Sequence, residues 1–406
     1  NNRAYFFLLI MNVNTEIIGP PKEDIFKSGK FRSFIVQSIV MILVISFITW
    51  VVNNTATNMK ANGIAHGFDF LWEASWFDIG YLPFIEHTGY HSYFNAFLVG
   101  LLNTILVAVL GIFFATILGF MVGIGRLSEN WLVAKFCGFY IEILRNIPLL
   151  LQIFFWYHAV LRILPRAKNS LNVSDSFFLN LKGLFIPRPV AEVGFNYVLL
   201  IGILSITGII SLYFWSKKRQ NITGKQFPVF LTSIVILIIP IFIVSFLLNF
   251  PLTWEQPVLK GFNFKGGIRL IPELVALLLA LSLYTASFIA ENVRSGILAI
   301  SKGQKEAAAA VGLKPGQILR LIVIPQAMRV IIPPLTSQYL NLTKNSSLAV
   351  AIAYPDLVHV FAGTALMQTG QAVEILAMTM SVYLALSLSI SLLMNWYNSA
   401  MALKDR

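Results

Sequence analysis

Residues 306–325 read EAAAAVGLKPGQILRLIVIP, a polar, helix-forming stretch between long apolar segments. Its opening Glu-Ala-Ala favours a helix, and Gly312 is a residue type at which helices commonly end. The Lys-Pro-Gly sequence at 314–316 predicts a turn. A second helical segment over 317–324 then returns to the apolar region at Pro325. Loops between membrane segments are usually irregular, so this regular pattern indicates a surface that another protein binds.

The composition predicts a membrane protein. Of the 406 residues, 57% are hydrophobic and only 12% are charged, whereas soluble domains contain about 25% charged residues. The net charge of +12 fits basic cytoplasmic loops beside a lipid bilayer, and nucleic acid is the weaker explanation. The single cysteine, Cys137, excludes an internal disulfide and supplies no metal-binding set. We therefore expect a bilayer-embedded protein without nucleic acid or metal.

Eight apolar segments are long enough to span a membrane, which takes about 20 residues in a helix. They predict an all-α integral membrane protein, and they are Phe34–Val52, Phe94–Gly125, Phe139–Leu161, Tyr197–Trp215, Phe227–Leu248, Pro272–Ala290, Ala327–Leu348 and Ile375–Tyr397. The seventh carries Arg329, Pro333, Pro334, Lys344 and Asn345. That pattern predicts a broken helix lining a cavity, where protein or water satisfies the freed backbone groups.

Lysine and arginine are distributed unevenly over the two sides of this predicted bundle. With the N-terminus inside and eight crossings, 19 of the 30 basic residues fall on the inner side and 9 on the outer side. The bias predicts that both termini and the 306–325 loop face the cytoplasm. No cleavable signal pattern accompanies the first apolar segment. The start at Asn1 rather than Met leads us to expect further residues upstream.

Two segments are predicted to lie outside the membrane on the outer side. Residues 53–93 carry many aromatic side chains, which suits a helix or cap at the level of the headgroups. Residues 249–271 are rich in Pro, Gly and aromatic residues and predict a packed loop. The apolar pair at 197–248, joined by the basic stretch 217–225, interrupts the rest and has the character of an insertion.

The carboxylate of Glu306 gives the polar loop a docking role. A short rigid helix with a charge at its start and alanines along it can lie close in a groove of a motor protein. The other interpretation is an ordinary basic loop, but such loops lack the Glu-Ala-Ala start, the later glycine and the proline at the return. The coupling residues that this pattern predicts are Glu306, Ala307, Ala308, Gly312 and Pro325.

Five motifs, in order along the chain, resemble the general (polar) L-amino-acid ABC transporter permeases of the histidine-permease group. They are GLLNTILVAVLG at 100–111, EILRNIPLLLQIFF at 142–155, YTASFIAENVRSGILAI at 284–300, KGQKEAAAAVGL at 302–313 and LTKNSSLAVAIAYPDL at 342–357. The resemblance covers nearly all of the chain from about Phe68, and the fourth motif is similar to the family's EAA coupling loop. One departure is Asn292, where many relatives carry an apolar or β-branched residue.

The resemblance implies a type I ABC importer permease, with a core of five helices, an extra N-terminal helix and an inserted helix pair. The implied divisions are a cytoplasmic segment at 1–33, a first helix with a periplasmic aromatic-rich segment at 34–93, the permease domain at 94–397 (inserted pair 197–248, coupling loop 295–325) and a cytoplasmic tail at 398–406.

The resemblance also implies L-amino acids as cargo, a bacterial inner membrane as location, and several partners. These are two ATP-binding cassette subunits that use ATP and Mg, a second permease subunit (a heterodimer in preference to a homodimer) and a periplasmic amino-acid-binding protein. The chain itself lacks a G-x-x-x-x-G-K-[ST] motif, because Gly224-Lys225 is followed by Gln226. It also shows no nucleophile–base arrangement, so we expect neither a bound cofactor nor enzyme activity.

A second class of function is an ion-gradient-driven secondary amino-acid transporter. Such proteins often show inverted repeats and intramembrane carboxylates that couple to ions. This chain shows no clear repeat and few acids within its apolar segments. A docking loop also has no use without an external motor, so the ATP-driven importer is the preferred hypothesis.

Two basic residues fall at membrane depth, where a cation usually has a partner or lines a water path. Arg145 and Lys344 can each pair with the carboxylate of an amino-acid substrate. Arg145 has structural alternatives, namely pairing with Glu142 one turn away or extending to the membrane surface. Lys344 lies beside a polar cluster, so both interpretations of it stay open; the cluster comprises Asn345, Ser346 and Ser347.

Other polar residues in the apolar segments have the same two interpretations. Glu291 has Arg294 three positions on, so an intrahelical ion pair is preferred to a substrate contact. Gln152 either lines the path or makes a hydrogen bond between helices. The same choice holds for Asn103 and Thr104.

Overall fold

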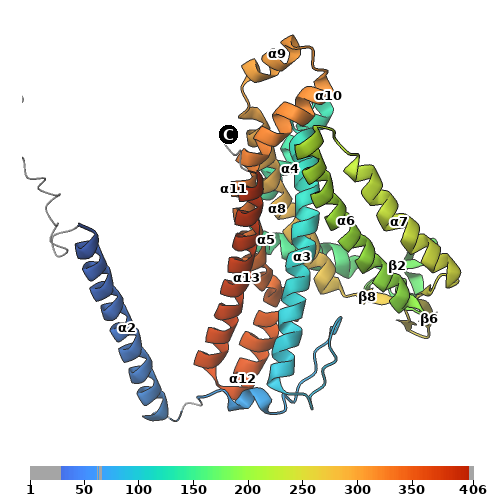
Figure 1. Ribbon diagram of the computed structural model, residues 1–406. Helices are drawn as coiled ribbons and strands as arrows, with labels where there is room; N and C mark the ends of the chain where they lie inside the picture. Colours follow the sequence, from blue (N-terminus) through green and yellow to red (C-terminus); the bar gives the residue numbers. More distant parts are fainter. Residues whose placement is uncertain (1–28, 62, 64–65, 402–406) are drawn as a thin grey trace, which may run out of the picture. The chain divides into compact units, whose positions relative to one another are not determined.

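Long apolar helices dominate the chain, as its composition predicts. The computed structural model describes residues 29–61, 63 and 66–401 (Figure 1). The predicted N-terminal segment up to residue 28 and the end of the tail at 402–406 lie outside the described residues. Within the described part, seven helices are long and apolar enough to cross a membrane, or eight if a bent pair counts as one span. The expected helical membrane bundle with about eight spans is thus confirmed.

The described residues fall into two compact units. The smaller contains α2 (Gly29–Ala61) with Thr369–Val373, and the larger contains Asp69–Gln368 and the chain from Glu374 onward. The helix α2 includes the predicted span 34–52 and extends it at both ends. Its large apolar side chains are exposed along its length, which suits a helix that lipid surrounds.

The core of the larger unit is built on α3 (Tyr93–Gly125) and α8 (Pro272–Leu298), which pack along each other (Figure 1). Small residues allow the two backbones to come close, because a Cβ added to Gly119 would lie 2.5 Å from Cγ2 of Ile289. The long C-terminal helix α13 (Ala372–Met401) and α11 (Ile324–Asn345) complete this part of the bundle. The sequence predicted the bounds of α3 to within one residue.

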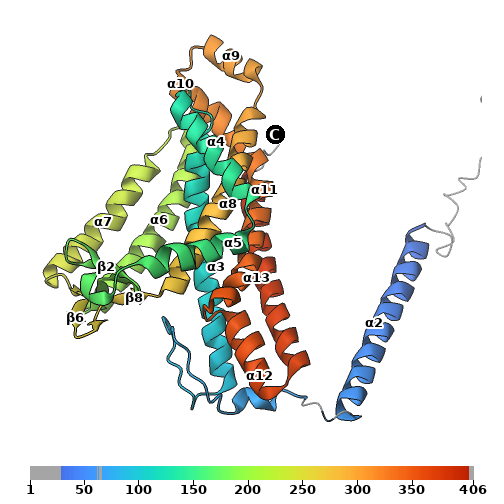
Figure 2. The ribbon, with the colours of Figure 1, turned by 180° about the vertical axis from the view of Figure 1, so that it is seen from behind.

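The third predicted span, 139–161, is a bent pair and not a straight helix. α4 (Trp131–Asn146) is followed by α5 (Leu149–Phe154), and the two segments meet at 106° (Figure 2). The helical segments η3 (Phe155–Val160) and η4 (Leu161–Ile163) continue α5. The cause is Pro148, since a residue before proline avoids the helical region. Ile147 is accordingly extended, with φ −96° and ψ 127°.

The prediction that the seventh segment, 327–348, is a broken helix is wrong. Residues Pro315–Ile352 form one helical rod of 38 residues, and both prolines lie inside it. Ile331, Ile332 and Leu335 beside the prolines are buried, so tertiary packing compensates for the missing backbone donors. In chain order the rod comprises α10 (Pro315–Ile318), the π-helix η6 (Leu319–Val323), α11 and the 3-10 helix η7 (Ser346–Ile352).

The rod ends at a short non-helical stretch, residues 353–356, which we call the break. Ala353 has φ +58°, an uncommon value for a residue other than glycine. Helical structure resumes in the π-helix η8 (Val358–Ala365) and α12 (Leu366–Thr369). A break therefore exists, but about twenty positions beyond the prolines.

Residues 53–61 of the predicted outer segment belong to α2, and residues 69–92 form a short helix and an extended hairpin. The helix is η2 (Asp69–Trp72), whose Phe70 and Leu71 pack into the core beside Phe361. The hairpin closes with a backbone bridge between Ala74 and Ser92. The predicted cap at headgroup level is thus mostly extended chain, held by buried aromatic side chains.

Small β-sheets occupy segments for which the sequence predicted only loops. One sheet has the order β1-β2-β3-β8, and two-stranded ribbons pair β4 with β5 and β6 with β7. The inserted helices α6 (Phe195–Thr223) and α7 (Val229–Leu247) pack on each other. In the chain they lie between β4 and β5. The strands are β1 (Leu171–Val173), β2 (Phe177–Asn180), β3 (Gly183–Ile186), β4 (Arg188–Ala191), β5 (Leu252–Glu255), β6 (Val258–Lys260), β7 (Asn263–Lys265) and β8 (Ile268–Leu270).

Candidate coupling surface and polar core

The predicted Glu-Ala-Ala helix is α9 (Lys302–Ala310), which begins four residues before Glu306. The carboxylate therefore lies in the middle of the helix and not, as was predicted, at its start. Gly312 ends it with φ +83°, a conformation that glycine adopts without strain. Its N–H donates to Ala309 O at 2.9 Å, and the N–H of Leu313 donates to Ala308 O at 3.2 Å. These two bonds make a Schellman motif. The predicted helix stop is therefore confirmed, with its mechanism.

One face of α9 is open to a partner. Glu306 and Ala307 are exposed, while Ala308 is buried against the rest of the bundle. Val311, just after the helix, is 77% exposed although it is apolar. Figure 1 shows α9 at the end of the bundle opposite to α12. A carboxylate, small alanines and an unpaired apolar side chain are features that suit docking onto another protein.

Pro325 lies inside the rod, which is helical from Pro315 and so includes the predicted helical segment 317–324. Its role as the point of return to the membrane stays a prediction. The chain widens into the π-helix η6 just before Pro325, where the N–H of Ile324 donates to Leu319 O. A proline inside an α-helix has no N–H and clashes with the preceding turn. The π-helix therefore accommodates Pro325, and this irregular turn of the rod lies next to the coupling segment.

Asn103 and Thr104 of α3 hold the break between η7 and η8. The Asn103 side chain donates to Pro355 O at 2.9 Å and to Tyr81 O at 3.3 Å, while Tyr354 donates to Asn103 O at 3.2 Å. The Thr104 hydroxyl accepts from the N–H of Leu357 at 3.0 Å. Backbone groups that lose helical partners inside a membrane bundle must find others, and these two side chains supply them.

Close approach of α3 to the break also requires a glycine. A Cβ on Gly100 would lie 2.9 Å from the Cα of Leu357. Asp356, which is 1% exposed, caps the following helix by accepting from the N–H of His359 at 2.8 Å. Asp356 had no predicted role. The Pro-Asp pair inside an apolar run was the signal that could have indicated a helix stop followed by a new N-cap.

Gln152 has a local structural role. Its side chain is 4% exposed, and its Nε2 donates to Leu144 O and to Ile147 O, both at 2.9 Å. Both acceptors lie at the end of α4. The residue thus satisfies carbonyls that the bend at Pro148 leaves free. The hydrogen-bonding interpretation fits this geometry better than a path-lining one.

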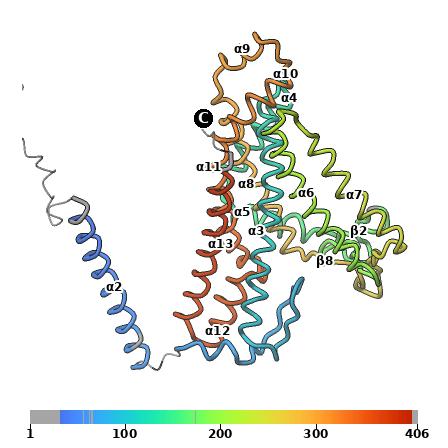
Figure 3. Tube along the Cα trace, in the orientation of Figure 1, coloured from blue at the N-terminus to red at the C-terminus, as the bar shows by residue number. Residues whose placement is uncertain are grey.

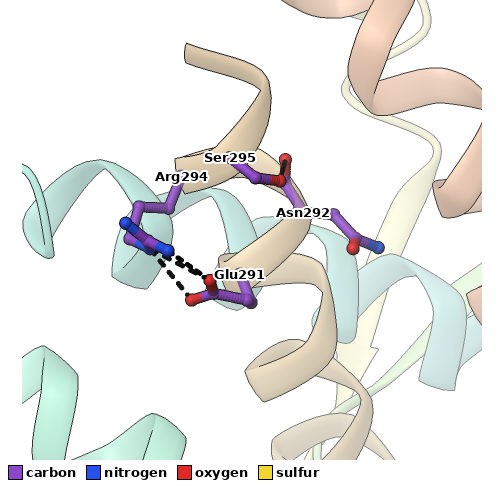
Figure 4. A network of polar contacts seen from close by, with 4 residues as sticks. All are labelled: Glu291, Asn292, Arg294 and Ser295. Carbon is purple, nitrogen blue, oxygen red and sulfur yellow. Dashed lines mark hydrogen bonds and ion pairs between the residues drawn. The ribbon is translucent and has the colours of Figure 1, made fainter. Parts of the chain in front are cut away.

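Glu291 and Arg294 form an ion pair on α8 (Figure 4). The Arg294 Nε donates to both carboxylate oxygens, at 3.0 and 3.1 Å. The two side chains are 30% and 34% exposed, respectively. Figure 4 shows Asn292 pointing away from this pair, and its buried Nδ2 has no hydrogen-bond partner among the described residues. The predicted i,i+3 pairing is therefore present.

The two cations at membrane depth have different surroundings. The Arg145 guanidinium lies over the Phe288 ring, 5.0 Å from its centroid, and no ion pair joins it to Glu142 in the part of the chain that the structure describes. It is close enough to Glu291 to act on it electrostatically. Lys344 is exposed on α11.

The polar cluster beside Lys344 bonds largely to its own helix. The hydroxyls of Ser346 and Ser347 donate to Thr343 O and Lys344 O, both at 2.7 Å, while Asn345 is half-buried. Neither hydrogen bonds nor ion pairs connect this cluster to Glu291 or Arg145 within the described residues. Those residues also contain no group of three or more His, Cys, Asp or Glu side chains that could hold a metal ion.

The bundle of long apolar helices, with the short polar helix α9 between two core helices, defines a multi-pass membrane protein. Comparison with known proteins gives the family. The model of the "Binding-protein-dependent transport system inner membrane component" family matches residues 225–403.

Two curated relatives align along almost their whole length. The "General L-amino acid transport system permease protein AapQ" of Rhizobium johnstonii is 50% identical over 93% of this chain and 94% of its own. The "Putative amino-acid ABC transporter permease protein YhdX" of Escherichia coli is 49% identical over 94% of this chain and 97% of its own. A solved amino-acid ABC transporter with histidines is 18% identical, covers 76% of this chain and 95% of its own, and has a TM-score of 0.46.

The chain belongs to the amino-acid ABC transporter permeases, the inner-membrane components of binding-protein-dependent transport systems. It is a multi-pass membrane subunit of such an importer. This membership does not favour the ion-gradient-driven alternative.

Proposed function

We propose that this permease converts ATP-driven closure of a separate ATPase into movement of L-amino acids across the bacterial inner membrane. The observation that carries the proposal is the position of α9. It lies between the C-terminal end of α8 and the start of the Pro315–Ile352 rod. Both neighbours contribute to the main hydrophobic core, so a force on α9 acts directly on the core.

Glu306 and Ala307 are the proposed contact with the ATPase. Ala308 contributes to coupling by packing α9 against the bundle, and Gly312 fixes the end of the docking helix. Pro325 contributes through the π-turn that precedes it. ATP and Mg are bound by the partner ATPase in this proposal, and this chain supplies the membrane path. The amino-acid cargo is inferred from the names of the relatives AapQ and YhdX.

The proposed assembly contains two ATP-binding cassette subunits, a second permease subunit and a periplasmic amino-acid-binding protein. A related but different permease is the preferred partner, which makes a heterodimer. Both termini and α9 face the cytoplasm in this arrangement, which the distribution of Lys and Arg supports. The permease domain is assigned to 94–397, with 197–248 as an insertion.

The polar residues of the core are proposed to act on the substrate's charges as it passes. Glu291 and Arg145 lie within electrostatic reach of each other on neighbouring helices. Lys344 and Asn345 are accessible on the α11 surface. Gln152, Ser346 and Ser347 donate their side-chain hydrogen bonds to nearby backbone carbonyls. We propose them as path residues only because of where their helices lie.

A substitution at Glu306 tests the coupling role. Glu306→Ala in the full complex, reconstituted into liposomes with its binding protein, should abolish ATP-driven uptake while the complex still inserts. The control is Glu129→Ala, an equally exposed carboxylate in the turn between α3 and α4, which should leave uptake unchanged. Normal uptake by the Glu306→Ala complex would remove the coupling role from this helix. If uptake by the wild-type complex continues without ATP but stops when the ion gradient is dissipated, a secondary transporter would instead be supported.

A further inference from the structure

A cavity of about 340 Å³ lies beside the break between η7 and η8. We call it the outer cavity. Its polar walls come from three parts of the chain: the hairpin, the β8–α8 junction, and the break with the start of η8. The lining residues used below are Asp78, Arg269, Ile271, Glu273, Ala353, Pro355 and Val360. Figure 3 shows the hairpin, drawn in blue, at the end of the bundle opposite to α9.

The charged groups of the outer cavity are held in place by hydrogen bonds. The Nε of Arg269 donates to Lys182 O at 3.0 Å, which leaves its two terminal nitrogens for an anion. Glu273, in the first turn of α8, accepts from the Tyr157 hydroxyl at 2.8 Å through Oε1, which leaves Oε2 for a cation. Asp78 accepts from the N–H of Gly89 at 2.9 Å. The cavity therefore presents one fixed cation and two fixed carboxylates.

This arrangement is complementary to a molecule that carries both charges close together. A guanidinium binds a carboxylate with two parallel hydrogen bonds, and a carboxylate binds an ammonium group. Apolar side chains such as Ile271 and Val360 also line the cavity and can accept a side chain of the ligand. The volume is at the lower end of the range typical of small-molecule sites, which suits a single amino acid and not a peptide.

We propose that the outer cavity is a receiving site for the free amino acid on its way into the permease. Arg269 binds the α-carboxylate, and Glu273 with Asp78 binds the α-ammonium group. This inference rests on the proposed importer function and adds a site for the cargo outside the polar core. Ala353 and Pro355 line the site. An occupant therefore contacts the break, which is bonded to α3 through Asn103.

Photolabelling tests the site in the intact complex. A diazirine-bearing L-amino acid that the wild-type importer takes up is irradiated with the purified complex, and labelled peptides are mapped. Label is expected on peptides containing 269–273 or 353–364, and free substrate amino acid should compete with it. The same amino acid with its amine acetylated and its carboxylate amidated should not compete, because neither charge remains.

Substitutions assign the two charges. Arg269→Gln and Glu273→Gln should each raise the half-competing concentration of the free amino acid about tenfold, the loss expected for one charge-assisted hydrogen-bonding group. Arg269→Lys, which keeps the charge, should recover part of the effect. The control is Arg166→Gln, an exposed arginine of the same outer region that does not line the cavity, and it should leave competition unchanged.

The outcomes separate this inference from the importer function. If the wild-type complex transports amino acids, but label maps elsewhere or competition is unaffected by both Arg269→Gln and Glu273→Gln, the receiving site is wrong and the function stands. If the wild-type complex shows no ATP-driven amino-acid uptake, the function itself is wrong. A thermal unfolding measurement on each variant identifies any that lost its fold, and Arg269→Lys then decides the role of the charge.

Discussion

The side chain of Asn103 donates a 2.9 Å hydrogen bond to the carbonyl of Pro355, which lies 252 positions later in the chain. The contact joins the middle of α3 to the one stretch where the rod from Pro315 loses its helical hydrogen bonds. Tyr354 returns a hydrogen bond to the backbone of Asn103. This reciprocal arrangement fixes the position of the break relative to α3.

Replacement of Asn103 should destabilise the complex. Asn103→Leu keeps the side-chain volume but leaves the carbonyls of Pro355 and Tyr81 without this donor, and buried unsatisfied acceptors cost about 1–3 kcal/mol. Equilibrium unfolding of the purified complex in mild detergent measures the effect. The matched control is Asn341→Leu, at an exposed position of α11, for which we expect a change below about 0.5 kcal/mol. Equal stabilities for the two variants would show that the contact contributes nothing.

The glycines of α3 should not tolerate a side chain. In Gly119→Ala the new methyl group would meet Ile289 at 2.5 Å, and overpacking of this kind costs about 1–3 kcal/mol. Gly303→Ala in α9 is the control, because no atom lies within 4 Å of the added Cβ and alanine favours a helix. We expect a lower unfolding temperature for the first variant and an unchanged or higher one for the second. The reverse order would mean that α3 and α8 can move apart freely.

Val311 should contribute to binding of the ATPase. A Val311→Asp variant places a charge where an exposed apolar side chain now ends α9, and it should weaken association by at least about 1 kcal/mol, or roughly fivefold. Titration of the ATPase against the permease in lipid nanodiscs measures this. Leu171→Asp, on the exposed outer strand β1, is the control for the added charge. Undiminished binding by the first variant would place Val311 outside the interface.

The Glu291–Arg294 pair should contribute little to stability. Both side chains are about one-third exposed, and a pair of that kind is worth about 0.2–1 kcal/mol. A double-mutant cycle with Glu291→Gln and Arg294→Gln, measured by equilibrium unfolding, should give a coupling energy in that range. If uptake by the single variants falls much further than this energy explains, the pair acts on the substrate. A coupling energy above about 2 kcal/mol would instead mark it as a structural element.

The location of helices in the chain could be predicted, but their interruptions could not. The apolar run that became α3 was delimited to within one residue, because length and hydropathy suffice to define a span. Pro148 did bend its segment, whereas Pro333 and Pro334 did not. The difference lies in the neighbours, since buried side chains beside the second pair hold the helix together. Local sequence contains no record of that packing.

The candidate site divides in the same way. The end of α9 at Gly312 was predictable, because a helix stop signal acts over a few residues, but its start was not, since the helix begins at Lys302 and Glu306 lies in its middle. The partners of Gln152 and Asn103 were not predictable, since each polar side chain in an apolar helix has several acceptors within reach until the fold selects one. Asp356 was overlooked because its capping role depends on the break.

The sequence by itself determined the membrane class, the approximate spans, the short polar helix α9 and the family resemblance. These follow from hydropathy, local helix signals and motif order, all of which act over short stretches of chain. Only the tertiary structure decided where the rod breaks, which side chains satisfy the freed backbone groups, and how distant strands such as β3 and β8 pair. Those outcomes depend on contacts between residues far apart in the chain, whose energies no local pattern encodes.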